Sequence, residues 1–211
     1  ELSNDSIKYL LKLYVKFHEE AEKDETLNDL ARAEFKKLED GNKESLALWK
    51  LFKELSLKEF QRIYKLLGVS FDSFDGEAFI NKFVPKTIRE IKSKVKTEIS
   101  DNALIVDLKK FDLPPVILLK SDGATTYHSR DAAAIFYRLN KFKAEKILYV
   151  VGSEQKMHFQ QLFKLMELIG FGKEKFVHAD FGLFRFPEGK MSTRKGNVIF
   201  LEEVLNKSIE L

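Results

Sequence analysis

The fold class follows most directly from one segment, Ile147-Leu148-Tyr149-Val150-Val151-Gly152-Ser153-Glu154-Gln155. Its first five residues are continuously apolar, as in a strand that is covered on both faces. A helical pattern follows, in which apolar residues recur at three- and four-residue steps: Phe159, Leu162, Phe163, Met166 and Ile169. A buried strand that runs through a glycine turn into an amphipathic helix is typical of a parallel sheet with covering helices. We therefore predict an α/β fold.

Other predicted elements alternate upstream of this segment. Lysine-rich residues 86–98 predict an exposed helix, and residues 103–108 and 116–120 are short β-type runs. Ser-Asp-Gly at 121–123 predicts a hairpin turn, and Ser129 is placed to cap the helix that follows it. Strands and helices in this order support the prediction of a parallel sheet.

The first third of the chain has helical periodicity throughout. The pattern in residues 1–67 predicts four amphipathic helices with short connections. The third of these covers 46–55, and the fourth begins at Ser56, which has Glu59 at capping-box spacing. Gly68 is suited to end the fourth helix, since a glycine often follows the last helical turn.

Composition excludes several classes of protein. Hydrophobic residues make up 44% of the 211 residues, and 19 residues are Phe, so a sizeable core can form. The absence of cysteine excludes a disulfide scaffold, a Cys-ligated zinc site and a Cys nucleophile. No apolar run approaches the roughly 20 residues that span a bilayer, so we expect a globular protein of the cytoplasm with no membrane partner. The net charge of +3 is too small to indicate a nucleic-acid partner by itself.

The histidines offer no metal site in the sequence. His18, His128, His158 and His178 lie far apart and match no metal-ligand spacing. We interpret each of them as a packed or surface residue, and we predict no bound metal.

Tyr127 and Asp131 allow two interpretations. They lie four residues apart at a predicted helix start, so a phenol and a carboxylate can converge on a cationic ligand such as a guanidinium. In the other interpretation the tyrosine is a packing residue, and the aspartate is favoured by the helix dipole. The residues alone leave both interpretations open.

A basic segment near the end of the chain also allows two interpretations. Gly189-Lys190-Met191-Ser192-Thr193-Arg194-Lys195-Gly196-Asn197 holds three cations and two hydroxyls, and no acidic residue occurs from Gly189 to Leu201. Such a loop can close over a polyphosphate and neutralise charge that develops in a transition state. A solvated basic loop has the same composition, so the order of the residues has to decide.

The order of these residues matches a known pattern. Residues 190–197 resemble the second signature loop of class I aminoacyl-tRNA synthetases, in the form found in arginyl-tRNA synthetases. Residues 120–131 resemble the arginine-site segment of that family, and residues 149–159 resemble the segment that follows it. The resemblance extends from about Ala31 to the end of the chain, in the correct order and spacing.

The resemblance implies roles for individual residues. Tyr127, Asp131 and Gln155 would bind L-arginine, with the first two on its guanidinium side. The mobile loop that stabilises the ATP phosphates would comprise Lys190, Met191, Ser192, Thr193, Arg194 and Lys195. Other residues implied to bind ATP are Gly152, Glu154, Gly182, Leu183 and, again, Lys190.

The resemblance also implies a fold and a reaction. Residues 69–211 would form the second half of a Rossmann-type parallel sheet with the signature loop, and residues 1–68 would belong to a helical insertion that precedes it. The family joins L-arginine to ATP, which binds with Mg, and then transfers the arginine to tRNA(Arg). It needs no tightly bound cofactor.

Two departures from the family pattern shape the prediction. Thr193 stands where the usual loop has its second lysine, so Arg194 or Lys195 would supply that charge. None of the histidines is followed by x-Gly-His, which is the first signature of the class. We therefore expect an excised part of a longer enzyme that binds ATP and arginine weakly or not at all alone. The alternative is a non-catalytic synthetase-like paralogue that binds nucleotide or RNA.

Overall fold

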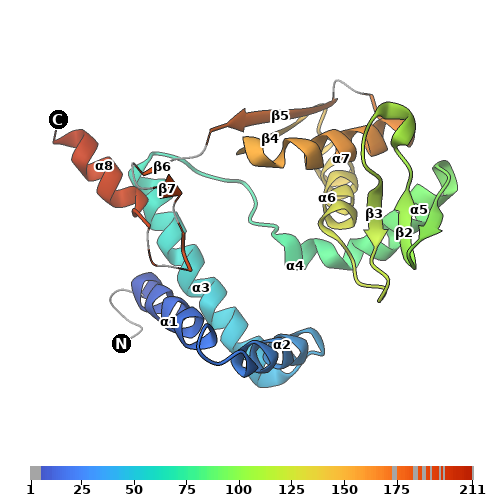
Figure 1. The fold of residues 1–211 in the computed structure, drawn as a ribbon. Helices are drawn as coiled ribbons and strands as arrows, with labels where there is room; N and C mark the ends of the chain where they lie inside the picture. The colour runs from blue at the N-terminus through green and yellow to red at the C-terminus, as the bar shows by residue number, and fades with distance from the viewer. Residues whose placement is uncertain are drawn as a thin grey trace. The chain divides into compact units, whose positions relative to one another are not determined.

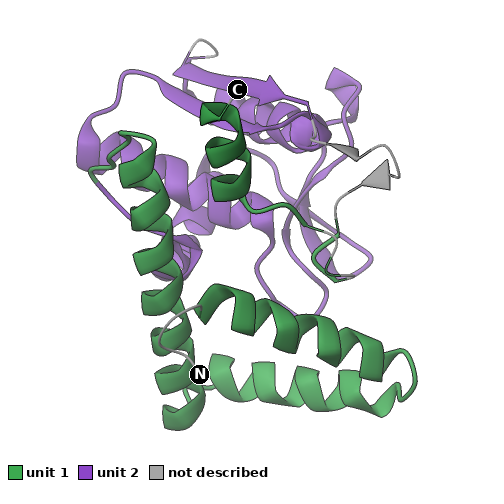
Figure 2. Ribbon diagram, turned by 90° about the vertical axis from the view of Figure 1, so that its left-hand side faces the viewer, with its two compact units in different colours: residues 1–72, 184–211 green, residues 73–183 purple. Residues whose placement is uncertain are grey.

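A computed structural model describes residues 6–172, 175–182, 185–186, 189–190, 192–194, 196 and 198–210. The chain divides into two compact units (Figure 2). One unit combines residues 1–72 with 184–211, and the other comprises residues 73–183. The described chain is a mixed α/β structure in which helices predominate.

The first unit is built mainly from helices. Its elements are α1 (Ser6–Ala21), α2 (Thr26–Glu39), α3 (Lys43–Leu66), α8 (Leu201–Ile209) and the antiparallel strand pair β6 (Arg185–Phe186) and β7 (Gly189–Lys190). The helices α1, α2 and α3 contact one another, and α3 is the long helix of Figure 1. Ala21, which is 6% exposed, is the one buried residue in the described part of these helices, so they bury little apolar surface.

The helix α3 corrects the prediction of four helices in residues 1–67. It continues without a break through Ser56, so the capping-box spacing of Ser56 and Glu59 marks no helix start. The helix is capped instead by Asn42, whose side chain accepts hydrogen bonds from the amides of Glu44 and Ser45. No glycine or proline interrupts the chain around Ser56, and a serine in a helix interior costs only about 0.5 kcal/mol. Gly68 follows the end of the helix at a φ of +66°, as predicted.

The second unit alternates helices and strands. Its elements are α4 (Glu77–Ile80), η1 (Asn81–Phe83), α5 (Val84–Lys94), β1 (Glu98–Ser100), β2 (Ala103–Val106), η2 (Lys109–Phe111), β3 (Val116–Leu119), α6 (Tyr127–Phe142), β4 (Ile147–Gly152), η3 (Ser153–Gln155), α7 (Lys156–Leu168) and β5 (Phe176–Phe181). The predicted turn at 121–123 is confirmed, because Gly123 adopts a φ of +82° and its amide donates to the carbonyl of Lys120 at 2.9 Å.

The strands form separate sheets, and the prediction of a parallel sheet is correct for only one of them. β4 and β5 are parallel, with Ile147 opposite Phe176 and Gly152 opposite Phe181. β1, β2 and β3 form an antiparallel sheet in that order. The connection between β2 and β3 is too short for the crossover of about a dozen residues that a parallel pair needs, whereas α7 supplies that crossover between β4 and β5.

The main hydrophobic core lies inside the second unit. It packs α5, α6 and α7 against the strands, and it includes the fully buried side chains Ile91, Leu108, Leu118, Ile135, Leu162, Leu165 and Met166. The helix predicted at 86–98 is therefore not wholly exposed. It ends at Lys94 and buries Val84, Ile88 and Ile91 along one side.

The prediction that the strand at 147–151 is covered on both faces is wrong. Ile147 and Tyr149 are buried, but Leu148 is 61% exposed and Val150 is 69% exposed. The helices α6 and α7 lie on the same side of the β4–β5 pair (Figure 1), so alternate side chains of β4 remain open. Among the described residues, no helix combines the length and apolarity needed to cross a membrane.

Candidate functional site

The start of α6 places the first pair of candidate residues. Thr126 is the N-cap: its hydroxyl accepts from the Ser129 amide at 3.4 Å and donates to the Ile117 carbonyl at 2.5 Å. Ser129 is the reciprocal partner, since its hydroxyl accepts from the Thr126 amide at 3.0 Å, so the prediction of Ser129 as the cap is wrong by three positions. The cap fixes the first turn, and Tyr127 and Asp131 then lie one turn apart on the same side of the helix.

Tyr127 and Asp131 line the same hollow of about 260 Å³ in the second unit. Its other lining residues are Asp75, Gly76, Glu77, Ile80, Arg130, Ala134 and Arg138. Tyr127 is 59% exposed, which is more than a packing tyrosine would be, and the Asp131 side chain is 39% exposed. Both groups are therefore accessible to a small ligand.

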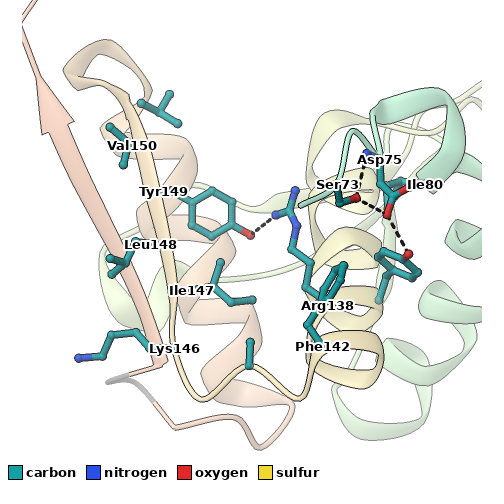
Figure 3. A pocket seen from close by; sticks show the side chains of 13 residues that line it. Ser73, Asp75, Ile80, Arg138, Phe142, Lys146, Ile147, Leu148, Tyr149 and Val150 are labelled. Carbon is teal, nitrogen blue, oxygen red and sulfur yellow. Dashed lines mark hydrogen bonds between the residues drawn. The ribbon is translucent and has the colours of Figure 1, made fainter. Parts of the chain in front are cut away.

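The two arginines of this hollow already have partners other than Asp131. Arg130 Nε lies 2.6 Å from Glu77 Oε1, and its Nη1 donates to the carbonyl oxygen and the hydroxyl of Thr125 at 3.0 and 2.9 Å. Arg138 Nη1 donates to the Tyr149 hydroxyl at 3.3 Å, and Figure 3 shows these two side chains pointing toward each other from α6 and β4. The carboxylate of Asp131 consequently has no arginine among its hydrogen-bonding partners within the described residues.

A second hollow, of about 480 Å³, adjoins the first along β4. Asp75 stands at its rim, where its carboxylate accepts from the hydroxyls of Ser73 at 2.7 Å and Tyr137 at 2.9 Å (Figure 3). These hydrogen bonds hold the pKa of Asp75 below its usual range. Burial raises the pKa of Tyr149, which lies on the opposite wall, to about 12, so Tyr149 is a neutral phenol.

Two histidines join Tyr127 and Asp131, and sequence reasoning missed them. His158 Nε2 lies 2.7 Å from Asp131 Oδ2, and its ring centroid is 4.9 Å from that of Tyr127. His128 contacts both rings, with 4.7 Å between the two imidazole centroids and 4.6 Å to the Tyr127 ring. Burial lowers the pKa of His128 to about 4, and the neighbouring His158 acts in the same direction. The interpretation as a packed residue is confirmed for His128, which is 4% exposed, and is incomplete for His158, which also hydrogen-bonds a candidate ligand group.

The end of β4 holds the other candidate residues of this unit. Gln155 ends η3 with its side chain exposed, three residues before His158, and Glu154 is also exposed. The Glu154 carboxylate fills the space in which a Cβ on Gly152 would lie. The glycine therefore permits the close approach of the Glu154 side chain to the backbone. Its φ of −57° can be adopted by any residue, so backbone conformation does not require a glycine here. Gly182 follows β5 with open space around it.

The predicted signature loop belongs to the other compact unit. Lys190 lies in β7, Ser192 is half-buried, and Thr193 and Arg194 are exposed. The Gly196 amide donates to the Thr193 carbonyl at 3.2 Å, and Gly196 has a φ of +66°, so the chain turns here. Leu183, Met191, Lys195 and the side chain of Lys190 lie outside the described residues. Within the described ranges, no three histidine or acidic side chains gather as metal ligands.

A family model described as "tRNA synthetases class I (R), catalytic domain" matches residues 1–211, which is the whole chain. The fold and the match define a class I aminoacyl-tRNA synthetase catalytic region. Within that class, the chain belongs to the arginyl-tRNA synthetase family, whose members are ligases.

Individual relatives agree with this assignment. The chain is 50% identical over 211 residues to an arginine–tRNA ligase of Clostridium kluyveri, and 49% identical to one of Clostridium perfringens. It spans all or nearly all of its own length in these matches but only 37% of the length of each relative.

Solved structures show the same fold. Arginyl-tRNA synthetase from Plasmodium falciparum is similar with a TM-score of 0.71 at 23% identity, over 88% of this chain and 31% of that one. The Thermus thermophilus enzyme is similar with a TM-score of 0.63 at 18% identity, over 84% and 37% of the two chains.

Proposed function

We propose that this chain supplies the arginine-binding part of an arginine–tRNA ligase. One observation carries the proposal. Tyr127 and Asp131 line one accessible hollow, and the Asp131 carboxylate is paired with no arginine or lysine of the described chain. A carboxylate can accept paired N–H bonds from a planar guanidinium, which the point charge of a lysine cannot reproduce. Gln155 would contact the same amino acid from the end of β4.

The reaction follows from the chemistry of the family. The arginine carboxylate attacks the α-phosphorus of ATP, which binds with Mg as a substrate, and pyrophosphate leaves. A hydroxyl at the 3′ end of tRNA(Arg) then displaces AMP. No covalent bond to the protein forms, so the work of the site is positioning and charge neutralisation.

We propose that two segments of the chain bind ATP. Gly152, Glu154, Gly182 and Leu183 would bind ATP at the ends of β4 and β5, where ligands of open α/β sheets are found. The loop of Lys190, Met191, Ser192, Thr193, Arg194 and Lys195 would stabilise its phosphates. In this proposal residues 69–211 form half of a Rossmann-type catalytic domain of a cytoplasmic enzyme, and residues 1–68 belong to a helical insertion.

The first test compares Asp131→Asn with Asp75→Asn. Both variants remove one negative charge from the same hollow, but Asp75 accepts hydrogen bonds from the hydroxyls of Ser73 and Tyr137, so its replacement leaves no arginine of the hollow unpaired. The variants are made in a chimera in which residues 1–211 replace the matching part of the Clostridium kluyveri ligase, and arginine-dependent ATP–pyrophosphate exchange is measured with tRNA(Arg) present.

We expect Asp131→Asn to lower kcat/KM for arginine about 100-fold, because a charge-assisted pair worth about 3 kcal/mol is lost. Asp75→Asn should change kcat/KM for arginine less than about fivefold, since a lost net charge alone acts through solvent. Equal losses would show that only the total charge of the hollow matters. An unsubstituted chimera that binds ATP and activates no arginine would favour the non-catalytic paralogue.

A further inference from the structure

The contact between Asp131 and His158 has an asymmetric geometry. His158 Nε2 lies 2.7 Å from Oδ2 of the carboxylate, and the histidine side chain is 12% exposed. The other ring nitrogen, Nδ1, is buried and has no hydrogen-bond partner in the described part of the chain. In the imidazole of His158, Nε2 therefore makes a hydrogen-bond contact and Nδ1 makes none within the described residues.

This asymmetry selects a tautomer. The carboxylate can only accept, so Nε2 must carry the proton that bridges to Oδ2. A proton on Nδ1 would be a buried donor without an acceptor, which is unfavourable, whereas a bare Nδ1 loses only a weak acceptor site. The contact geometry therefore favours the tautomer with its proton on Nε2.

The surrounding rings hold the imidazole in this orientation. Tyr127 meets it edge-on at 4.9 Å, Phe159 does so at 5.0 Å, and His128 packs at 4.7 Å. His128 is 4% exposed, and burial keeps its pKa near 4, so it adds no positive charge at neutral pH. The cluster thus presents the Nε2 of His158 to Asp131 as a hydrogen-bond donor.

We propose that His158 is a positioning residue for the arginine site, in which its neutral Nε2–H fixes Oδ2 of Asp131 and leaves Oδ1 to receive the guanidinium. The inference rests on the proposed function. A charged partner would cancel the negative charge that attracts the substrate, whereas a neutral donor orients the carboxylate and preserves its charge. His158 touches no reacting atom and acts through Asp131 alone.

The kinetic test uses His158→Leu and His158→Gln in the chimera. Leu removes the donor, while Gln can place an amide N–H where Nε2 lies. For His158→Leu we expect KM for arginine to rise about 10- to 100-fold, as when a hydrogen bond to a charged group is lost, with kcat and KM for ATP within about twofold of the unsubstituted chimera. His158→Gln should restore KM for arginine to within about threefold.

A second measurement needs no variant and no activity. Imidazole ¹⁵N spectra of the 211-residue chain should show His158 protonated at Nε2 and bare at Nδ1. A proton on Nδ1 would overturn the proposal, and so would His158→Leu with an unchanged KM for arginine or a His158→Gln variant as impaired as His158→Leu. Those results leave the proposed function standing, whereas an unsubstituted chimera that activates no arginine removes both.

Discussion

His128 links the candidate site to the stability of the fold. Its pKa falls from 6.5 in the unfolded chain to about 4 in the folded one because burial disfavours the imidazolium. As the pH falls below 6.5, the unfolded chain takes up a proton that the folded chain does not, so folding loses free energy until the pH reaches about 4. The shift corresponds to a loss of about 3 kcal/mol over this range.

We expect the replacement His128→Phe to remove this part of the acid sensitivity. Urea unfolding of the unsubstituted chain and of the variant, followed from about pH 7 to about pH 4.5, measures the difference directly. The carboxylates titrate in both proteins, so their contribution cancels in the comparison. Parallel pH profiles for the two proteins would contradict the assigned role of burial at His128.

The sequence could predict that two site residues lie together where they are close in the chain. Tyr127 and Asp131 are four apart on one helix, and helical geometry alone places them together. His158 is 27 residues from Asp131, on another helix, and its contact depends on how α6 and α7 pack. Asp131 lies in the helix that follows β3 and His158 in the helix that follows β4, and these strands belong to different sheets, so no spacing in the sequence links the two residues.

At the level of elements, α3 shows why a capping motif is ambiguous. Ser-x-x-Glu at 56–59 and the true cap at Asn42 both offer a polar side chain three residues before a polar or acidic one. The residue before each motif distinguishes the true helix start from the false one. Gly41 precedes Asn42 at a φ of +81° and is not helical, whereas Leu55 is itself helical and leads into Ser56. A motif read without its upstream neighbours therefore predicted a break that does not exist.

Paired substitutions test this reading of α3. Asn42→Ala should lower the free energy of unfolding by about 1 kcal/mol, because the side chain caps the amides of the first turn. Ser56→Ala should raise it by a few tenths, about 0.3 kcal/mol, since alanine is the better residue inside a helix. Chemical denaturation followed by circular dichroism separates the two, and a loss at Ser56 equal to that at Asn42 would restore the four-helix interpretation.

The strands show which part of the sheet could be predicted. The strand β4 and the crossover helix after it follow from the hydrophobic pattern, whereas β5, with which β4 pairs in parallel, was not predicted. Whether helices cover one face of β4 or both faces could not be predicted, because a continuously apolar sequence is compatible with either arrangement. Leu148 and Val150 remain open because the described helices of the unit pack on the side of Ile147 and Tyr149.

Across the described part of the molecule, the buried apolar side chains are concentrated in residues 73–183. The connected core of buried side chains runs from Ile80 to Phe176, inside that unit. The helices of the other unit bury little, and several of their large apolar residues are exposed, among them Leu30 at 61% and Phe35 at 60%. The proposed division into residues 1–68 and 69–211 stays a prediction.

We expect a polypeptide of residues 73–183 to unfold cooperatively by itself, because it holds a core and its own crossover strand pair. Residues 1–72 alone should melt gradually, as helices without buried contacts do. Thermal circular dichroism of the two polypeptides, with calorimetry on the first, provides the comparison. A broad transition in residues 73–183 would show that the ends of the chain are needed for its core.

The ion pair between α3 and α8 has a kinetic consequence. Arg62 donates to both oxygens of Glu202 at 2.7 and 2.5 Å, and the two residues are 140 positions apart. The contacts of α1, α2 and α3 are local and form early, whereas α8 can reach α3 only by closing a loop that contains the whole of residues 73–183. During synthesis the intervening unit leaves the ribosome first and can fold as a unit, so the docking of α8 onto α3 is the last step in the assembly of its own compact unit.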